Sequence, residues 1–174
     1  MIRELKAYNS RNIYSHQKVI KMIVDLEKWD DIATNQIPSF NQRLLELLPG
    51  LAVHHCSVGH EGGFKKRLDE GTYLAHVIEH SALEILNQIG QQVSFGRARR
   101  INDTSCYIIV FAHREEHAGL EAGKTAFQLI QALSTGMPFN ISEKIKRIQE
   151  MAWKFGLGPS TKAIADAALD RGIP

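Results

Sequence analysis

The sequence lacks the features that mark several classes of protein. Its 174 residues contain no apolar run long enough to cross a bilayer, and residues 1–8 lack the hydrophobic segment of a signal peptide. Cysteine is scarce, because Cys56 and Cys106 are the only two. Two cysteines are too few for a disulfide framework or for a zinc site built from thiolates alone. These absences predict a cytoplasmic protein in a reducing compartment, without membrane contact.

Neither sign of charge dominates the chain. It has 21 Lys and Arg against 19 Asp and Glu, and the formal net charge is +2. A balance this close to neutral gives little support to nucleic-acid binding, even though residues 95–100 include three arginines. Internal repeats and low-complexity segments are also missing. With 44% hydrophobic and 23% charged residues, the composition is that of a globular protein able to bury a core.

Hydrophobic periodicity predicts both strands and helices. Residues 19–26 fit a helix or a strand equally well. Strands are expected over residues 2–8, 51–56, 92–101 and 104–112, and helices over residues 40–48, 63–68, 72–90, 113–133, 141–155 and 162–172. The turn Asn102-Asp103 favours a hairpin between two of the strands. The expected fold is α+β, a mostly antiparallel sheet with helices packed on it. We divide the chain into an α+β domain, residues 1–139, and a small C-terminal helical extension, residues 140–174.

The helix expected over residues 72–90 carries the strongest chemical pattern. His76 and His80 lie one helical turn apart on the same face, with Glu79 close beside them. This His-x-x-Glu-His order is the signature of inverted zincins, in which both histidines bind zinc and the glutamate moves the proton of a zinc-bound water. The alternative is that the three residues form only a polar edge of the helix.

The same pattern occurs a second time, at His113, Glu116 and His117. That copy is strongly polar and falls where a strand gives way to a helix, so its two imidazoles need not face each other. The first copy lies inside an apolar helix, where buried ionisable groups require a metal or a hydrogen-bond network. The setting therefore favours His76 and His80 as the metal ligands.

A catalytic zinc site needs a third protein ligand and leaves the fourth position to water. In this class of enzyme the third ligand is a glutamate from a later helix, and the candidates are Glu115, Glu116 and Glu121. Glu116 is preferred, because it falls on the apolar stripe of its helix that should pack inward. Glu84, one turn beyond His80, could orient an imidazole from outside the ligand set or could be an exposed glutamate.

Two further groups could contact a ligand. Arg97 and Arg99 share one face of an expected strand and could hold carboxylates or phosphates by forked hydrogen bonds. A solvated strand end is the alternative. His60 lies in a glycine-rich loop before a short helix, where it could touch a ligand or simply face solvent.

Several phrases of the sequence together resemble the N-terminal domain of cyanophycin synthetase. They run in order over nearly the whole chain: IPSFNQRL at 37–44, LPGL at 48–51, CSVGHEGGF at 56–64, GTYLAHVIEH at 71–80, FGR at 95–97, LGPST at 157–161 and RGIP at 171–174. The resemblance implies a domain that, in the complete enzyme, is followed by an ATP-grasp module and a Mur-ligase-like module. ATP and magnesium would be used only in those modules, which are missing here.

The resemblance also implies a substrate, the β-Asp-Arg polymer cyanophycin. In some members of the family this domain carries a zinc-peptidase-like centre that cuts the polymer into primers. His76, Glu79 and His80 match that centre, and Glu116 matches the acidic position taken as the third ligand. Two functions remain open, a zinc-dependent hydrolase with Glu79 as general base and a non-catalytic tether that holds the polymer. Homo-oligomer formation is compatible with either.

Overall fold

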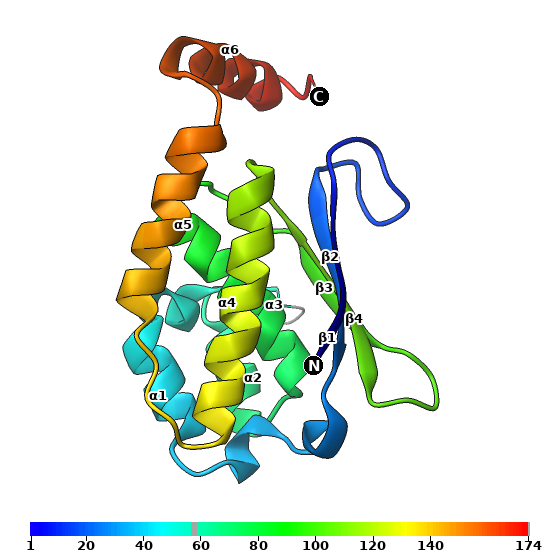
Figure 1. Cartoon of the computed structure of the whole chain (residues 1–174). Helices are drawn as coiled ribbons and strands as arrows, with labels where there is room; N and C mark the ends of the chain where they lie inside the picture. Colours follow the sequence, from blue (N-terminus) through cyan, green and yellow to red (C-terminus); the bar gives the residue numbers. More distant parts are fainter. Residues whose placement is uncertain (57–58, 174) are drawn as a thin grey trace.

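The computed structural model describes residues 1–56 and 59–173, and it has two layers. One layer is a four-stranded sheet in the order β1-β2-β4-β3, antiparallel throughout. The helices cover one face of this sheet (Figure 1). The strands are β1 (Ile2–Tyr8), β2 (Val19–Asp25), β3 (Gly96–Arg100) and β4 (Cys106–Ala112). The expected α+β class is confirmed.

Six α-helices and three short 3₁₀ segments make up the helical part of the described chain. The helices are α1 (Phe40–Leu47), α2 (Gly63–Glu70), α3 (Leu74–Gln88), α4 (Glu116–Ser134), α5 (Ile141–Phe155) and α6 (Pro159–Asp170), and the 3₁₀ segments are η1 (Glu27–Trp29), η2 (Thr34–Gln36) and η3 (Pro49–Val53). Within this part of the molecule, no helix is both long and apolar enough to span a membrane. Helix α5 packs on α4, and α6 extends beyond the end of α5 (Figure 1).

The segment that fitted either a helix or a strand is strand β2, in the interior of the sheet. It pairs with β1 on one side and β4 on the other. Ile20, Met22 and Val24 are fully buried and belong to the core. A strand in this position is buried along most of its length, and a nearly continuous apolar run has no period that separates it from a helix.

Helix α3 lies in the middle of the molecule. It contacts β3, β4, α4 and η3, and twelve of its fifteen residues are buried. The helix begins at Leu74 rather than at residue 72, and its N-cap, Tyr73, makes no side-chain capping bond. Gly90 ends the segment with φ of +83°, a conformation that costs glycine little. Most side chains of α3 are therefore held in place by packing.

The strand expected over residues 51–56 is wrong. Pro49–Val53 form the 3₁₀ segment η3, closed by a bond from the Leu51 N–H to the Leu48 carbonyl. Proline at the first position favours a helical start, and Leu51 anchors the turn in the core. This turn leads to His54 and Cys56, which lie against α3.

Candidate metal centre

Helix α3 presents His76 and His80 on one face, one turn apart. Their ring centroids are 4.7 Å apart and the rings are nearly perpendicular. Phe64, from α2, is fully buried and stacks on His80 with a centroid distance of 4.0 Å. The same phenyl ring meets His76 edge-on at 5.4 Å. Both imidazoles therefore pack against one buried phenyl ring, which restricts their rotation.

Cys56 supplies a third group to this face. Its Sγ lies 3.3 Å from Nε2 of His76. One potential ligand atom from each of Cys56, His76 and His80 lies within 4.8 Å of the others. Thiolate and imidazole are ligands that suit zinc, and three protein ligands would leave a fourth position for water. The donor set therefore fits a zinc ion of catalytic type.

A second layer of polar groups holds the imidazoles in place. Thr72 Oγ1 lies 3.0 Å from Nδ1 of His76. Nδ1 of His54 lies 3.1 Å from Nδ1 of His80, and Nε2 of His54 lies 2.9 Å from the Glu84 carboxylate. Glu84 thus reaches His80 only through His54. Such partners fix the orientation of ligating imidazoles.

Sequence reasoning missed Cys56, His54 and Thr72 at this site. A single cysteine carries no spacing signal, and His54 approaches α3 only after the chain turns through η3. The one available signal was the concentration of five histidines, His54, His55, His60, His76 and His80, within residues 54–80. A cluster of that kind indicates a metal site without saying which members contribute to it.

Burial keeps both α3 histidines neutral. Desolvation, with a smaller contribution from the Arg67 charge, lowers the pKa of His76 to about 4. The pKa of His80 is also far below its usual range, first because of burial and then because of His76 and His54. A neutral imidazole is the form that binds a metal. The local environment therefore favours the ligating form well below neutral pH.

Glu79 lies beside the histidines, on the side of α3 that faces β3. Its Oε1 is 3.9 Å from Nε2 of His80. A Cβ atom at Gly96 would come within 2.4 Å of that oxygen, so the carboxylate packs directly on the strand backbone. Burial raises the pKa of Glu79 to about 8, and the Arg97 charge opposes the shift. A carboxyl with a pKa near neutrality is well matched to proton transfer.

The raised pKa of Glu79 makes a stability prediction for the metal-free protein. In the folded protein the carboxyl stays protonated up to about pH 8, whereas in the unfolded chain it ionises near pH 4.5. The stability of the folded state therefore falls as the pH rises from about 4.5 to 8. Glu79→Gln removes that loss. We expect the variant to gain ~3 kcal/mol of unfolding free energy over wild type between pH 5 and pH 8, measured by urea unfolding with chelator present. The control is Glu150→Gln, at an exposed position; parallel profiles for wild type and Glu79→Gln would contradict the prediction.

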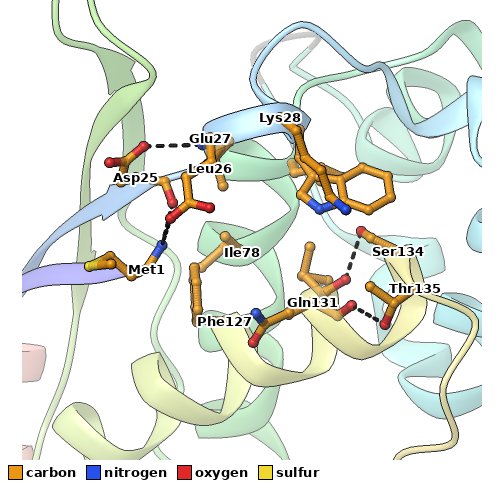
Figure 2. Close-up of a pocket in the computed structure, with 13 residues that line it drawn as sticks. Met1, Asp25, Leu26, Glu27, Lys28, Ile78, Phe127, Gln131, Ser134 and Thr135 are labelled. Atoms are coloured by element: carbon orange, nitrogen blue, oxygen red, sulfur yellow. Dashed lines mark hydrogen bonds and ion pairs between the residues drawn. The ribbon is translucent and has the colours of Figure 1, made fainter.

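The structure does not bring Glu116 to the histidines. Helix α4 runs antiparallel to α3. The start of α3 lies against the end of α4, because Leu74 and Ile78 line the same hollow of about 240 Å³ as Ile130 and Gln131. Ile78 and Phe127 lie close together there (Figure 2). Glu116 precedes Ile130 by fourteen residues, which is roughly 21 Å along a helix. Its carboxylate instead accepts a hydrogen bond from Asn9.

The other candidate glutamates also have local partners. Glu115 is the N-cap of α4 and accepts bonds from the N–H groups of His117 and Ala118. Glu121 pairs with Lys124 at 3.4 Å. In the second His-x-x-Glu-His copy, His113 is buried before α4 begins, whereas His117 is exposed and stacks on Phe155. These residues do not form a ligand set.

The predicted substrate-binding residues lie on two separate surfaces. Arg97 and Arg99 are exposed on β3, where they line a shallow hollow with Tyr14 and Phe95 on the sheet face away from the helices. Arg97 follows Gly96 along the strand, so its charge acts on Glu79 although its side chain points to the opposite face of the sheet. His60 is exposed in the loop before α2 and bonds through Nδ1 to the Glu61 carbonyl, outside the Cys56 group.

Comparison with known proteins identifies the family. The family model of the cyanophycin synthase-like N-terminal domain matches residues 21–135. The chain is 38% identical over 161 residues to the cyanophycin synthetase of Crocosphaera subtropica, and 39% identical over 176 aligned positions to that of Trichormus variabilis. These matches cover 91% and 99% of the chain, but only 18% and 19% of the relatives. The chain therefore belongs to the cyanophycin synthase-like N-terminal domain family.

Proposed function

We propose that this domain binds cyanophycin and hydrolyses it to short primers at the centre on α3. The observation that carries the proposal is the convergence of Cys56, His76 and His80 next to the buried carboxyl of Glu79. Three groups that suit zinc and one proton acceptor are the minimum set for metal-assisted amide hydrolysis. The relatives carry the name cyanophycin synthetase, which suggests the polymer as substrate.

Each residue has a distinct role in this proposal. Cys56, His76 and His80 would hold zinc, which supplies a Lewis acid and a water of lowered pKa. Glu79 takes a proton from the attacking water and delivers it to the leaving amine. The Arg97 charge favours the ionised carboxylate that accepts the proton. Thr72 orients His76, while His54 and Glu84 together orient His80.

Arg97 and Arg99 would hold the polymer near this centre. Neither has an ion-pair partner in the described part of the chain, so both guanidinium groups are available to ligand carboxylates. Cyanophycin offers a carboxylate at each repeat. ATP-dependent elongation would belong to ATP-grasp and Mur-ligase-like modules outside this chain, and ATP and magnesium would be used there.

A tether that holds the polymer without cutting it is the second candidate. The observation that favours it is the depth of Glu79, whose side chain is only 7% exposed. Holding a polymer requires no access to that group, since Arg97 and Arg99 are already on the surface. The two functions share a binding surface and differ in chemistry.

Incubating the zinc-supplemented protein with purified cyanophycin separates the two functions. We expect the protein to co-sediment with the insoluble polymer and to release shorter soluble chains, identified by mass spectrometry. Co-sedimentation without new chain ends would reject hydrolysis and leave the tether. Absence of both would reject both functions. Heat-denatured protein controls for non-specific adhesion and spontaneous breakdown.

A further inference from the structure

Strand β3 forms an edge of the sheet. Two backbone hydrogen bonds show which of its residues pair with β4 and which point outward. The Ala112 N–H donates to the Phe95 carbonyl at 2.8 Å, and the Ile101 N–H donates to the Cys106 carbonyl at 2.8 Å. In an antiparallel pair, residues bonded to the partner strand alternate with residues whose groups point away. Arg97 and Arg99 therefore bond to β4.

The outward set consists of Gly96, Ala98 and Arg100. The sheet order places no strand beyond β3. No residue of the described chain bonds to the outward N–H and C=O groups of these three. They form a short row of donors and acceptors at the spacing that an added strand would need.

This open edge lies next to the proposed catalytic carboxyl. Gly96 begins β3, and its backbone is so close to Glu79 that a methyl group there would overlap Oε1. A chain paired with Gly96 and Ala98 would therefore run next to the strand residue that contacts Glu79, whose Oε1 is 3.9 Å from Nε2 of His80. The open edge of β3 is therefore adjacent to the buried carboxyl of the proposed centre.

The charge at this edge suggests which chain it accepts. Arg100 is occupied, because it bonds to the Thr104 carbonyl and to Asp30. Arg97 and Arg99 are exposed, lack ion-pair partners in the described residues and point to the sheet face away from the helices. Arginines on an edge can serve simply to discourage aggregation. Because these two charges have no ion-pair partner in the described residues, they favour instead an extended chain whose side chains carry carboxylates.

We propose that the cyanophycin main chain adds to β3 as a fifth strand, paired with Gly96, Ala98 and Arg100, while Arg97 and Arg99 take its carboxylates. The inference rests on the proposed function for its substrate and extends it to a mode of binding. Main-chain bonds supply affinity and hold the chain in one register, and alternate side chains supply specificity. An amide bond of the polymer is thereby held beside Glu79.

Amide hydrogen exchange measured by NMR tests this mode directly. The probe is a soluble synthetic oligomer of β-Asp-Arg repeats, added to the Glu79→Gln variant so that cleavage does not interfere. In the free protein the Ala98 and Arg100 amides should exchange quickly, whereas the Arg97 and Arg99 amides, bonded to β4, should exchange slowly. On binding, we expect exchange at Ala98 and Arg100 to slow at least tenfold. Bound oligomer without that slowing would overturn the proposal, as would no binding at all.

A substitution gives an independent measurement. Ala98→Pro removes one outward N–H and leaves the bonds to β4 in place, a change that edge strands tolerate. Ala98→Gly keeps the N–H and is the matched control. We expect Ala98→Pro to bind the oligomer about fivefold to tenfold more weakly than Ala98→Gly. Equal affinities in two folded variants would overturn the strand pairing.

Two outcomes keep this proposal separate from the proposed function. If Ala98→Pro does not fold, an oligomer N-methylated at alternate main-chain amides replaces it, and equal affinity for the methylated and unmethylated oligomers overturns the pairing. Protection of Ala98 and Arg100 in a protein that never cleaves cyanophycin supports strand addition and rejects hydrolysis. Cleavage at an unchanged rate by folded Ala98→Pro rejects strand addition and leaves hydrolysis standing.

Discussion

Replacing Glu79 by glutamine will abolish cyanophycin cleavage while polymer binding persists. Glutamine has nearly the same shape but cannot accept the proton of the attacking water, so we expect a rate loss of ~10²–10⁴-fold. The measurement is the appearance of new chain ends in a time course followed by mass spectrometry. Binding should survive, because the guanidinium groups of Arg97 and Arg99 are unchanged.

Two comparisons make the result interpretable. Glu150→Gln, an exposed change on α5, should cleave at the wild-type rate. Co-sedimentation of the Glu79→Gln variant with cyanophycin should match wild type, which would show that the variant is folded and still holds the polymer. Cleavage at a near-normal rate in the Glu79→Gln variant would remove Glu79 from the mechanism.

The second large effect concerns the metal. Cys56→Ser and His76→Ala should each weaken zinc binding by at least ~100-fold, because each removes one of three converging donors. Glu116→Ala should leave zinc affinity unchanged, since that carboxylate lies at the far end of α4 and bonds to Asn9. Competition with a chromophoric chelator measures the affinities.

This comparison also decides between two ligand sets. The sequence pattern predicts His76, His80 and Glu116, whereas the structure gathers Cys56, His76 and His80. Loss of zinc in Glu116→Ala together with normal binding in Cys56→Ser would contradict the arrangement described here. Circular dichroism of each variant controls for loss of fold.

The histidine pair could be predicted because its geometry is local. A spacing of four residues places two side chains on one face of any helix, and the apolar period of residues 72–90 is strong enough to predict that helix. Tertiary packing adds only the orientation of the rings, which the stack of His80 on Phe64 provides. Helix α3 consequently agrees with its prediction apart from its ends.

The third donor could not be predicted because it depends on how distant segments pack. The helical period places Glu116 near the inward stripe of α4, but it contains no information on the direction in which α4 crosses α3. An antiparallel crossing puts the other end of α4 beside the start of α3, at Leu74 and Ile78. Cys56 follows the 3₁₀ segment Pro49–Val53, whereas the short apolar run that begins at Leu51 predicts a strand, so both the element and its contribution to the site were missed.

Removal and return of zinc would show whether this domain cleaves cyanophycin with a metal ion. The protein is treated with a chelator, dialysed and titrated with zinc while cleavage of cyanophycin is followed. We expect cleavage to disappear with the metal and to return in proportion to added zinc, reaching its full rate at about one ion per chain. Cleavage that continues unchanged after complete removal of the metal would contradict this expectation.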